Sequence, residues 1–133
     1  MATTTATITL SSADLTGDAL SLSSTATLTK AGTLTGLSQT TGIGRKTTTA
    51  TSQYVLFDGD AYESSAHKVY LKNTSTVATE YFTIEINSEQ MGKLYAGDWC
   101  FFPWEANADT NDIKITPSVS TSLTLEYALF IGD

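Results

Sequence analysis

The sequence predicts an all-β protein: an antiparallel β-sandwich of jelly-roll-like form, preceded by an extended, β-prone N-terminal arm. Residues 54–133 hold short runs of alternating apolar and polar residues, with turn residues about every ten positions, as in all-β domains. All thirteen aromatic residues lie after residue 53, whereas residues 1–53 hold seventeen of the twenty-five threonines. No stretch has the apolar spacing of a helix. We therefore divide the chain into an arm, residues 1–53, and a β-sandwich body, residues 54–133.

The arm consists largely of Thr, Ser, Ala, Gly and Leu. A segment without aromatic side chains buries little apolar area, so we expect the arm to gain order by lying against neighbouring molecules. The segment Thr5-Ala6-Thr7-Ile8-Thr9 recurs as Thr25-Ala26-Thr27-Leu28-Thr29. This repeat predicts one or two thin hairpins, or an arm that adds strands to a sheet, although chance similarity in a Thr-rich sequence gives the same pattern. Residues 38–53 are expected to form a linker or an extended crossing segment.

The body contains about seven predicted strands, each bounded by turn residues. They are residues 54–57, 67–72, 80–86, 91–95, 99–104, 112–116 and 123–130. In the second of these, Val69 and Leu71 share one face and Lys68, Tyr70 and Lys72 the other. In the third, Phe82, Ile84 and Ile86 are expected to face inward. Pro103 suits an edge strand or a strand end, because proline cannot donate to a central sheet ladder. Residues 61–67 have room for one helical turn at most.

A jelly-roll-like topology is preferred to an immunoglobulin-like one because the chain lacks the Cys-Trp-Cys frame of antibody domains. Cys100 is the only cysteine, so no disulfide within the chain is possible. A single cysteine forms neither a zinc knuckle nor a redox pair. Because Cys100 lies between Trp99 and Phe101, we expect it to be a small buried apolar residue.

Charge divides unevenly along the chain, whose net charge is −7. Residues 1–53 carry three basic and two acidic residues, and residues 54–133 carry four lysines against twelve acids. An acidic body repels phosphate backbones, so nucleic acid is not an expected partner. The sequence has neither the long apolar run of a membrane span nor, at residues 1–5, the basic start of a signal peptide. We expect synthesis in the host cytoplasm and no membrane partner.

No residue set predicts catalysis, a cofactor or a metal. His67, the only histidine, lies outside any Gly-x-Ser-x-Gly motif, so an ordinary strand residue is expected there. Carboxylates that could pair for glycoside hydrolysis are present, but nothing in the sequence selects two of them: Glu85, Glu105 and Glu126. The acidic segments 58–60 and 109–112 lack the spacing of a calcium-binding EF-hand, and turn chemistry explains their composition. The sequence therefore predicts a protein that is not an enzyme.

Two groups of residues are candidate interaction sites. Arg45 and Lys46 follow a Gly-Ile-Gly hinge and are expected to pair with acids on a neighbouring subunit. An aromatic cluster lies on a single predicted strand: Trp99, Phe101, Phe102 and Trp104. One face of this strand should be core, and the other should be covered by the arm, a loop or a partner. The alternative is a central strand buried on both faces.

Four segments of the body resemble small virion structural proteins of tailed bacteriophages. They are Val69-Tyr70-Leu71-Lys72-Asn73-Thr74-Ser75, Gly92-Lys93-Leu94-Tyr95-Ala96-Gly97-Asp98, Phe101-Phe102-Pro103-Trp104 and Leu125-Glu126-Tyr127. The similarity is one of general character, namely a Thr/Ser-rich arm, short strands, few charges and no catalytic set. It implies a capsid decoration (cement) protein, often a trimeric sandwich over junctions between capsomers, or else a neck, tail or fibre component. No site residues carry over from this family.

We therefore predict a non-enzymatic virion structural protein that self-associates, as a trimer by preference, and exchanges arms between subunits. Its expected partners are itself and the major capsid protein or another virion protein, and its expected location is the capsid surface. One alternative is a carbohydrate-binding or sugar-cleaving β module, for which an exposed Trp99 or Trp104 beside a groove would argue. Another is a surface β domain cut from a longer protein.

Overall fold

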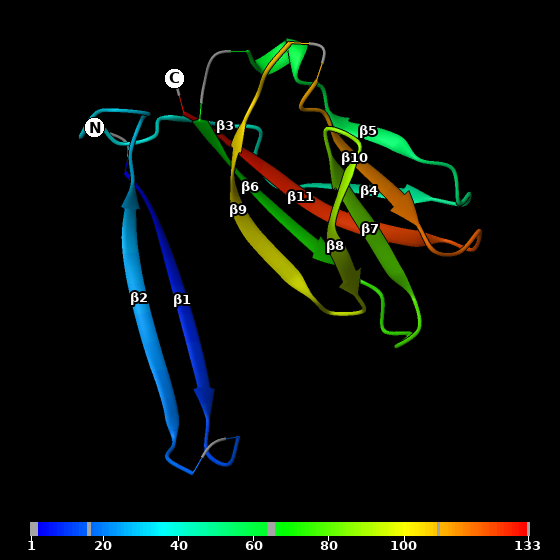
Figure 1. Ribbon diagram of the computed structural model, residues 1–133, viewed down its shortest axis with the longest axis horizontal. Helices are drawn as coiled ribbons and strands as arrows, with labels where there is room; N and C mark the ends of the chain where they lie inside the picture. Colours follow the sequence, from blue (N-terminus) through cyan, green and yellow to red (C-terminus); the bar gives the residue numbers. More distant parts are fainter. Residues whose placement is uncertain (1–2, 16, 64–65, 109, 133) are drawn as a thin grey trace.

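The structure is a computed structural model that describes residues 3–15, 17–63, 66–108 and 110–132. It consists of a two-stranded hairpin and a sandwich of two antiparallel sheets, with the hairpin projecting from one end of the sandwich (Figure 1). The predicted all-β sandwich is confirmed. Within the described residues the only helix is a three-residue 3-10 turn, Asp60–Tyr62, so none of them forms an apolar helix of membrane-spanning length.

The described residues contain eleven strands, and every paired neighbour runs antiparallel. They are β1 (Thr4–Ser12), β2 (Leu20–Leu28), β3 (Gln39–Thr40), β4 (Gly44–Thr48), β5 (Tyr54–Phe57), β6 (Ala66–Asn73), β7 (Tyr81–Ile86), β8 (Glu89–Tyr95), β9 (Trp99–Glu105), β10 (Ile113–Pro117) and β11 (Leu123–Ile131). The last seven correspond to the seven strands predicted in the body.

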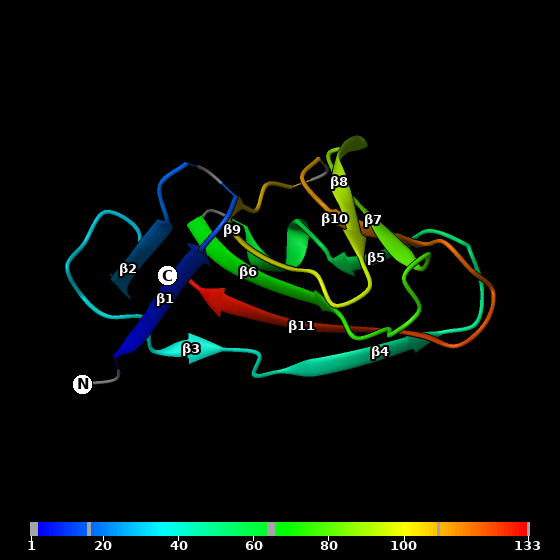
Figure 2. The same cartoon turned by 90° about the horizontal axis from the view of Figure 1, so that it is seen from below.

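One sheet of the sandwich has the order β5-β10-β7-β8, and the other has the order β3-β11-β6-β9, with β4 also on β11. Strands β3 and β4 pair with successive parts of β11, so together they form one interrupted edge (Figure 2). Strands β4 to β11 pair as β4 with β11, β5 with β10, β6 with β9 and β7 with β8. This part of the chain is therefore one long double-stranded ribbon. It is folded so that the pairs β4–β11 and β6–β9 lie in one sheet and the pairs β5–β10 and β7–β8 in the other.

The ribbon closes at a two-residue turn between β7 and β8. Asn87 and Ser88 both have positive φ, 52° and 63°. Two successive left-handed residues form a type I′ turn, whose twist matches that of the strands beside it. Asn adopts positive φ more readily than most residues, so Asn87 favours this turn and with it the β7–β8 hairpin.

The core lies between the two sheets and is built from the inward residues of each alternating strand. Its best-buried side chains include Val69, Leu71, Leu125 and Leu129 from one sheet and Phe82, Ile84, Ile113 and Ile115 from the other. Burying each of these side chains contributes about 1.5–3 kcal/mol. Val69 and Leu71, which share one face of β6 as expected, are both inaccessible to solvent. The predicted inward positions of Phe82 and Ile84 in β7 are confirmed, since both are buried.

His67 is buried in this core and is fully hydrogen-bonded. Its Nδ1 accepts from the backbone N–H of Gly132 at 3.1 Å, so the proton of a neutral ring lies on Nε2. Nε2 donates to the carbonyl oxygen of Tyr62 at 2.9 Å. The imidazole therefore joins β6 to two other segments, and both of its nitrogens are used in the structure.

Asn73 is the other buried polar side chain among the described residues, and it joins the two sheets at the end of β6. Its amide nitrogen donates to the carbonyl oxygens of Leu94 at 3.0 Å and Glu80 at 3.2 Å. Its Oδ1 accepts from the backbone N–H of Ser75 at 3.0 Å. A side chain of this size that satisfies three backbone groups fixes the start of the loop between β6 and β7.

Residues 38–53, expected to form a linker or an extended crossing segment, contain two extended strands, β3 and β4, which belong to the five-stranded sheet. The edge of the sandwich therefore does not coincide with the expected boundary at residue 53. Gly44 permits this pairing: a Cβ at this position would lie 2.8 Å from the ring of Tyr127, which packs against the backbone of β4. The backbone of β11 supplies the hydrogen bonds, which is why Thr-rich residues suffice.

Replacing Asn73 with Leu should lower the free energy of unfolding by about 2–4 kcal/mol, because three hydrogen bonds are lost and the buried carbonyl of Leu94 loses a donor. Urea unfolding followed by tryptophan fluorescence measures this. Thr76→Leu, at an exposed position of the same loop, is the matched control and should change stability little. Equal stability of the Asn73→Leu variant and the wild type would show that Asn73 does not hold the sheets together.

Candidate interaction site

The hairpin of β1 and β2 contains the repeat found in the sequence, and the two copies pair with each other. Thr5 lies opposite Thr27, Ala6 opposite Ala26 and Thr7 opposite Thr25. The predicted thin hairpin is confirmed. In the part of the chain that the structure describes, these strands have no sheet partner except each other. Backbone hydrogen bonds tie the base of the hairpin to the rest of the protein, from Leu37 to Leu28 and from Ala31 to Gly132.

The register gives the hairpin two chemically different faces, since residues directly opposite each other share a face. One face, which we call the aliphatic face, has seven aliphatic residues, Ala6, Ile8, Leu10, Leu20, Leu22, Ala26 and Leu28, together with Thr4, Ser12 and Ser24. The other face carries only hydroxyl side chains: Thr5, Thr7, Thr9, Ser11, Ser21, Ser23, Thr25 and Thr27. On that face the hydroxyls of Thr7 and Thr25 lie 2.8 Å apart and share a hydrogen bond.

The aliphatic face is uncovered along most of its length. Ile8, Leu10, Leu20 and Leu22 are between 40% and 48% exposed, and only Leu28, at the base, is buried. A lone two-stranded hairpin is marginally stable in water, and a contiguous exposed apolar patch usually marks an interaction surface. The strands themselves carry no charged residue. The aliphatic face is therefore the strongest candidate interaction site of this chain.

The aromatic cluster of β9 divides between two faces, as expected. Phe102 and Trp104 point into the core, where the Trp104 indole N–H donates to the carbonyl oxygen of Asn111 at 2.7 Å. Phe101 and Trp99 point outward, and Trp99 is 51% exposed. The alternative of a central strand is wrong, because β9 lies at the edge of its sheet, where Pro103 is tolerated.

Phe101 and Trp99 belong to a larger surface that we call the outer sheet face. It is formed by the outward side chains of β4, β11, β6 and β9: Arg45, Glu126, Phe130, Lys68, Tyr70, Lys72, Trp99 and Phe101. Phe101 packs edge-on against Phe130, with ring centroids 6.1 Å apart. Tyr70 lies directly opposite Phe101 in the register. The sequence did not predict that Tyr70 and Phe130 lie beside Phe101 on this surface. Their proximity depends on the pairing of β6 with β9 and β11, which the sequence pattern does not show.

Arg45 and Lys46 point to opposite sides of β4. The Arg45 guanidinium pairs with Glu126 of the same chain at 2.8 Å, so the acid expected on a neighbouring subunit lies on the adjacent strand. The ammonium of Lys46 lies over the ring of Tyr54, 4.1 Å from its centroid. Both cations therefore stabilise the attachment of β4 to the sandwich.

Arg45 also sets the ionisation of Glu126. The guanidinium beside it holds the pKa of the Glu126 carboxyl below its ordinary value, and the hydroxyl of Tyr70, which donates to Glu126 at 3.2 Å, acts in the same direction. Burial and the nearby carboxylate raise the pKa of Tyr70. Because the folded-state pKa of Glu126 is lowered, its contribution to stability is present at neutral pH and is lost as pH falls through that lowered value.

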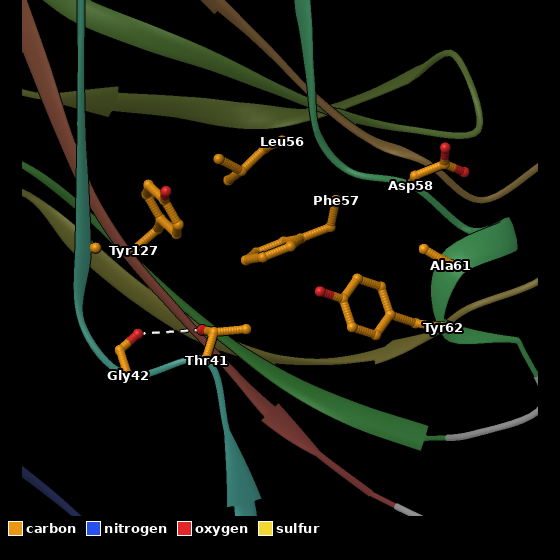
Figure 3. A pocket seen from close by; sticks show the side chains of 9 residues that line it. Thr41, Gly42, Leu56, Phe57, Asp58, Ala61, Tyr62 and Tyr127 are labelled. Atoms are coloured by element: carbon orange, nitrogen blue, oxygen red, sulfur yellow. Dashed lines mark hydrogen bonds between the residues drawn. The ribbon is translucent and has the colours of Figure 1, made fainter.

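A hollow of about 430 Å³ lies beside the strands β4 and β5 (Figure 3). Its aromatic wall consists of Phe57, Tyr62 and Tyr127, and Asp58 and Thr41 lie at its rim. Phe57 packs edge-on against both tyrosines, at centroid distances of 6.2 and 5.8 Å. Ligand pockets of proteins fall in this range of size.

The carboxylates considered for catalysis or metal binding are separated or already hydrogen-bonded. Glu85 lies on β7, in the sheet opposite Glu105 and Glu126, and accepts from the Gln53 amide at 2.6 Å. Asp112 accepts from the backbone N–H of Gly59 at 2.9 Å. Asp109 lies outside the described residues. Among the described residues, no three His, Cys, Asp or Glu side chains are grouped so that they could hold a metal ion.

Cys100 points toward the core side of β9 and is partly buried. Burial raises the pKa of its thiol to about 11, while a backbone hydrogen bond with Leu71 acts in the opposite direction. The thiolate is therefore scarce at neutral pH, in keeping with a packing role rather than a reactive one.

Comparison with known proteins identifies no relative: no family model, curated protein or solved structure matches this chain.

Replacing Arg45 with Met should raise the pKa of Glu126 toward its ordinary value of 4.5, because the ionised carboxylate loses its strongest partner. The carboxyl chemical shift of Glu126, followed by NMR during a pH titration, measures this change. Lys46→Met, one residue away on the other side of β4, is the matched control and should leave that titration unchanged. An identical titration in the Arg45→Met variant would contradict the assigned cause.

Proposed function

We propose that this protein is a non-enzymatic virion structural protein, in the first place a capsid decoration (cement) protein, that self-associates through its N-terminal hairpin. The observation that carries the proposal is the aliphatic face, which is exposed on a hairpin that stands away from the sandwich (Figure 1). A monomer would leave this surface in water, whereas assembly would bury it. Arm exchange between subunits follows from the same geometry.

The strand order of the sandwich supports this assignment. In a jelly roll, a double-stranded ribbon is folded into two Greek keys, and the pairs β4–β11, β5–β10, β6–β9 and β7–β8 correspond to that arrangement. We therefore interpret β4 to β11 as a jelly roll. This fold occurs in viral capsid proteins and in lectins, so it favours both a virion role and a carbohydrate-binding role.

The chemistry of the surface supports a protein partner rather than a nucleic acid. The net charge is −7, and the hairpin strands carry no charge. A decoration protein would place the hairpin or the sandwich against the major capsid protein, and a closed ring of three subunits would let each hairpin reach its neighbour. A neck, tail or fibre component would use the same hairpin on a different virion protein. Co-sedimentation with empty capsids, compared with isolated tails, distinguishes these positions.

Leu22→Asp should convert the self-associated protein into a monomer, because a carboxylate on the aliphatic face would be buried without a partner on assembly. Ser23→Asp is the matched control: it places the same charge on the neighbouring residue, which lies on the hydroxyl face, and should leave assembly intact. Sedimentation velocity gives the mass of each species. A monomeric wild type, or equal dissociation of both variants, would contradict self-association through the aliphatic face.

A carbohydrate-binding role is the second candidate, and the aromatic hollow beside β4 and β5 favours it (Figure 3). Aromatic rings bind the apolar faces of sugars. At the rim, one oxygen of the Asp58 carboxylate accepts from the backbone N–H of Asp60, and the other could accept a hydrogen bond from a sugar hydroxyl. Trp104 does not take part in this role, because it is buried in the core.

If the hollow binds a sugar, the wild type should give a signal on a glycan array that Asp58→Ala reduces. Asp60→Ala, two residues further on and outside the lining of the hollow, is the control. Absence of any array signal from the folded protein would reject the carbohydrate-binding role and leave the structural one unaffected.

A further inference from the structure

We infer that the aliphatic face of the hairpin docks on the outer sheet face of a second copy of the chain. This inference rests on the proposed self-association and names the surface that receives the hairpin. Each of the two surfaces is unpartnered in the single chain, as far as the described residues go, and each is built from regular strands. Exchange between copies would therefore cover both at once.

The two surfaces match in dimensions. Strands β1 and β2 have nine residues each, so the hairpin is about 30 Å long. In the outer sheet face, β11 has nine residues, β6 eight and β9 seven. Two antiparallel layers of similar length can pack face to face at about 10 Å, as sheets do in sandwiches.

The two surfaces also match in apolar chemistry. The aliphatic face offers Leu and Ile side chains and brings no charge into the contact. The outer sheet face offers the rings of Tyr70, Phe101 and Phe130, together with the exposed ring of Trp99. Aliphatic side chains on aromatic rings exclude water, and the hydroxyl of Ser24, which lies on this face opposite Ile8, would take a hydrogen-bond partner within the contact. The lysines on this face can extend their ammonium groups past the rim of such a contact.

The charges at the edges are complementary. The connection between β1 and β2 carries two carboxylates, Asp14 and Asp18. The outer sheet face carries three cations, Lys68, Lys72 and Arg45, and one acid of its list, Glu126, which pairs with Arg45 at 2.8 Å. The carboxylates at the end of the hairpin would therefore pair with Lys68 and Lys72 of the second copy.

The surface area buried by docking reaches that of a specific protein interface when two copies exchange their hairpins. A hairpin about 30 Å long and about 10 Å wide covers about 300 Å² on each partner. Two copies that exchange hairpins make this contact twice and bury about 1,200 Å² in total, which reaches the lower end of specific interfaces. A ring of three copies makes three such contacts.

Cross-linking between single-cysteine chains tests the docking. In a Cys100→Ser background, protein carrying Leu22→Cys is mixed with a differently tagged protein carrying Phe101→Cys and treated with a short bismaleimide. We expect a mixed cross-link between the two tags. Tyr95→Cys replaces an exposed aromatic residue on the opposite sheet, so it is the matched control and should give about tenfold less mixed product. Near-ultraviolet circular dichroism confirms that each variant is folded.

The outcomes separate this inference from the proposed function. Cross-links only between two Leu22→Cys hairpins, or equally to Tyr95→Cys, in an oligomeric protein would overturn the docking while leaving self-association intact. A monomeric protein without cross-links would overturn both.

If Phe101→Cys is unfolded, the double variant Lys68→Glu with Lys72→Glu provides the second test. This double variant should weaken assembly about tenfold at low salt, and Lys93→Glu, on the other sheet, should not. Unchanged assembly in the double variant would overturn the docking.

Discussion

The structure depends on the two-residue period of extended chain, which sends alternate side chains to opposite faces. In the sandwich, the apolar faces of two sheets cover each other, as the complete burial of Val69 and Ile115 illustrates. In the hairpin the same period operates, but no second layer lies over the aliphatic face within the described chain. One rule of backbone geometry thus produces a closed core in one part of the molecule and an open surface in the other.

Much of the body could be predicted from the sequence, because its strands alternate clearly and end at turn residues. Strands β6, β7 and β11 lie close to their expected positions, with the expected residues inward. Strands β3 and β4 could not be predicted, since their Thr-rich residues have no apolar pattern and are held by backbone pairing with a strand about eighty residues away. Pairing over such distances depends on topology, which short-range patterns do not contain.

The candidate site was predicted only in part, for the same reason. The outward position of Trp99 and Phe101 follows from alternation within β9, but their neighbours Tyr70 and Phe130 belong to other strands. The acid that pairs with Arg45 was expected on another subunit, yet Glu126 lies directly opposite in the register. The alternation of Ile8 and Leu10 with threonines could have predicted the aliphatic face. A prediction based on aromatic side chains misses this face, because residues 1–53 contain none.

The position of β11 in its sheet has a consequence for biosynthesis. This strand comes last among the described strands, yet it lies between β6 on one side and β3 and β4 on the other. Chain emerging from the ribosome can form the local hairpin of β1 and β2 early, whereas the five-stranded sheet has to wait for its central member. Non-local pairing of this kind is slow. The nascent chain should therefore expose the aliphatic face of the hairpin for some time before the sandwich closes.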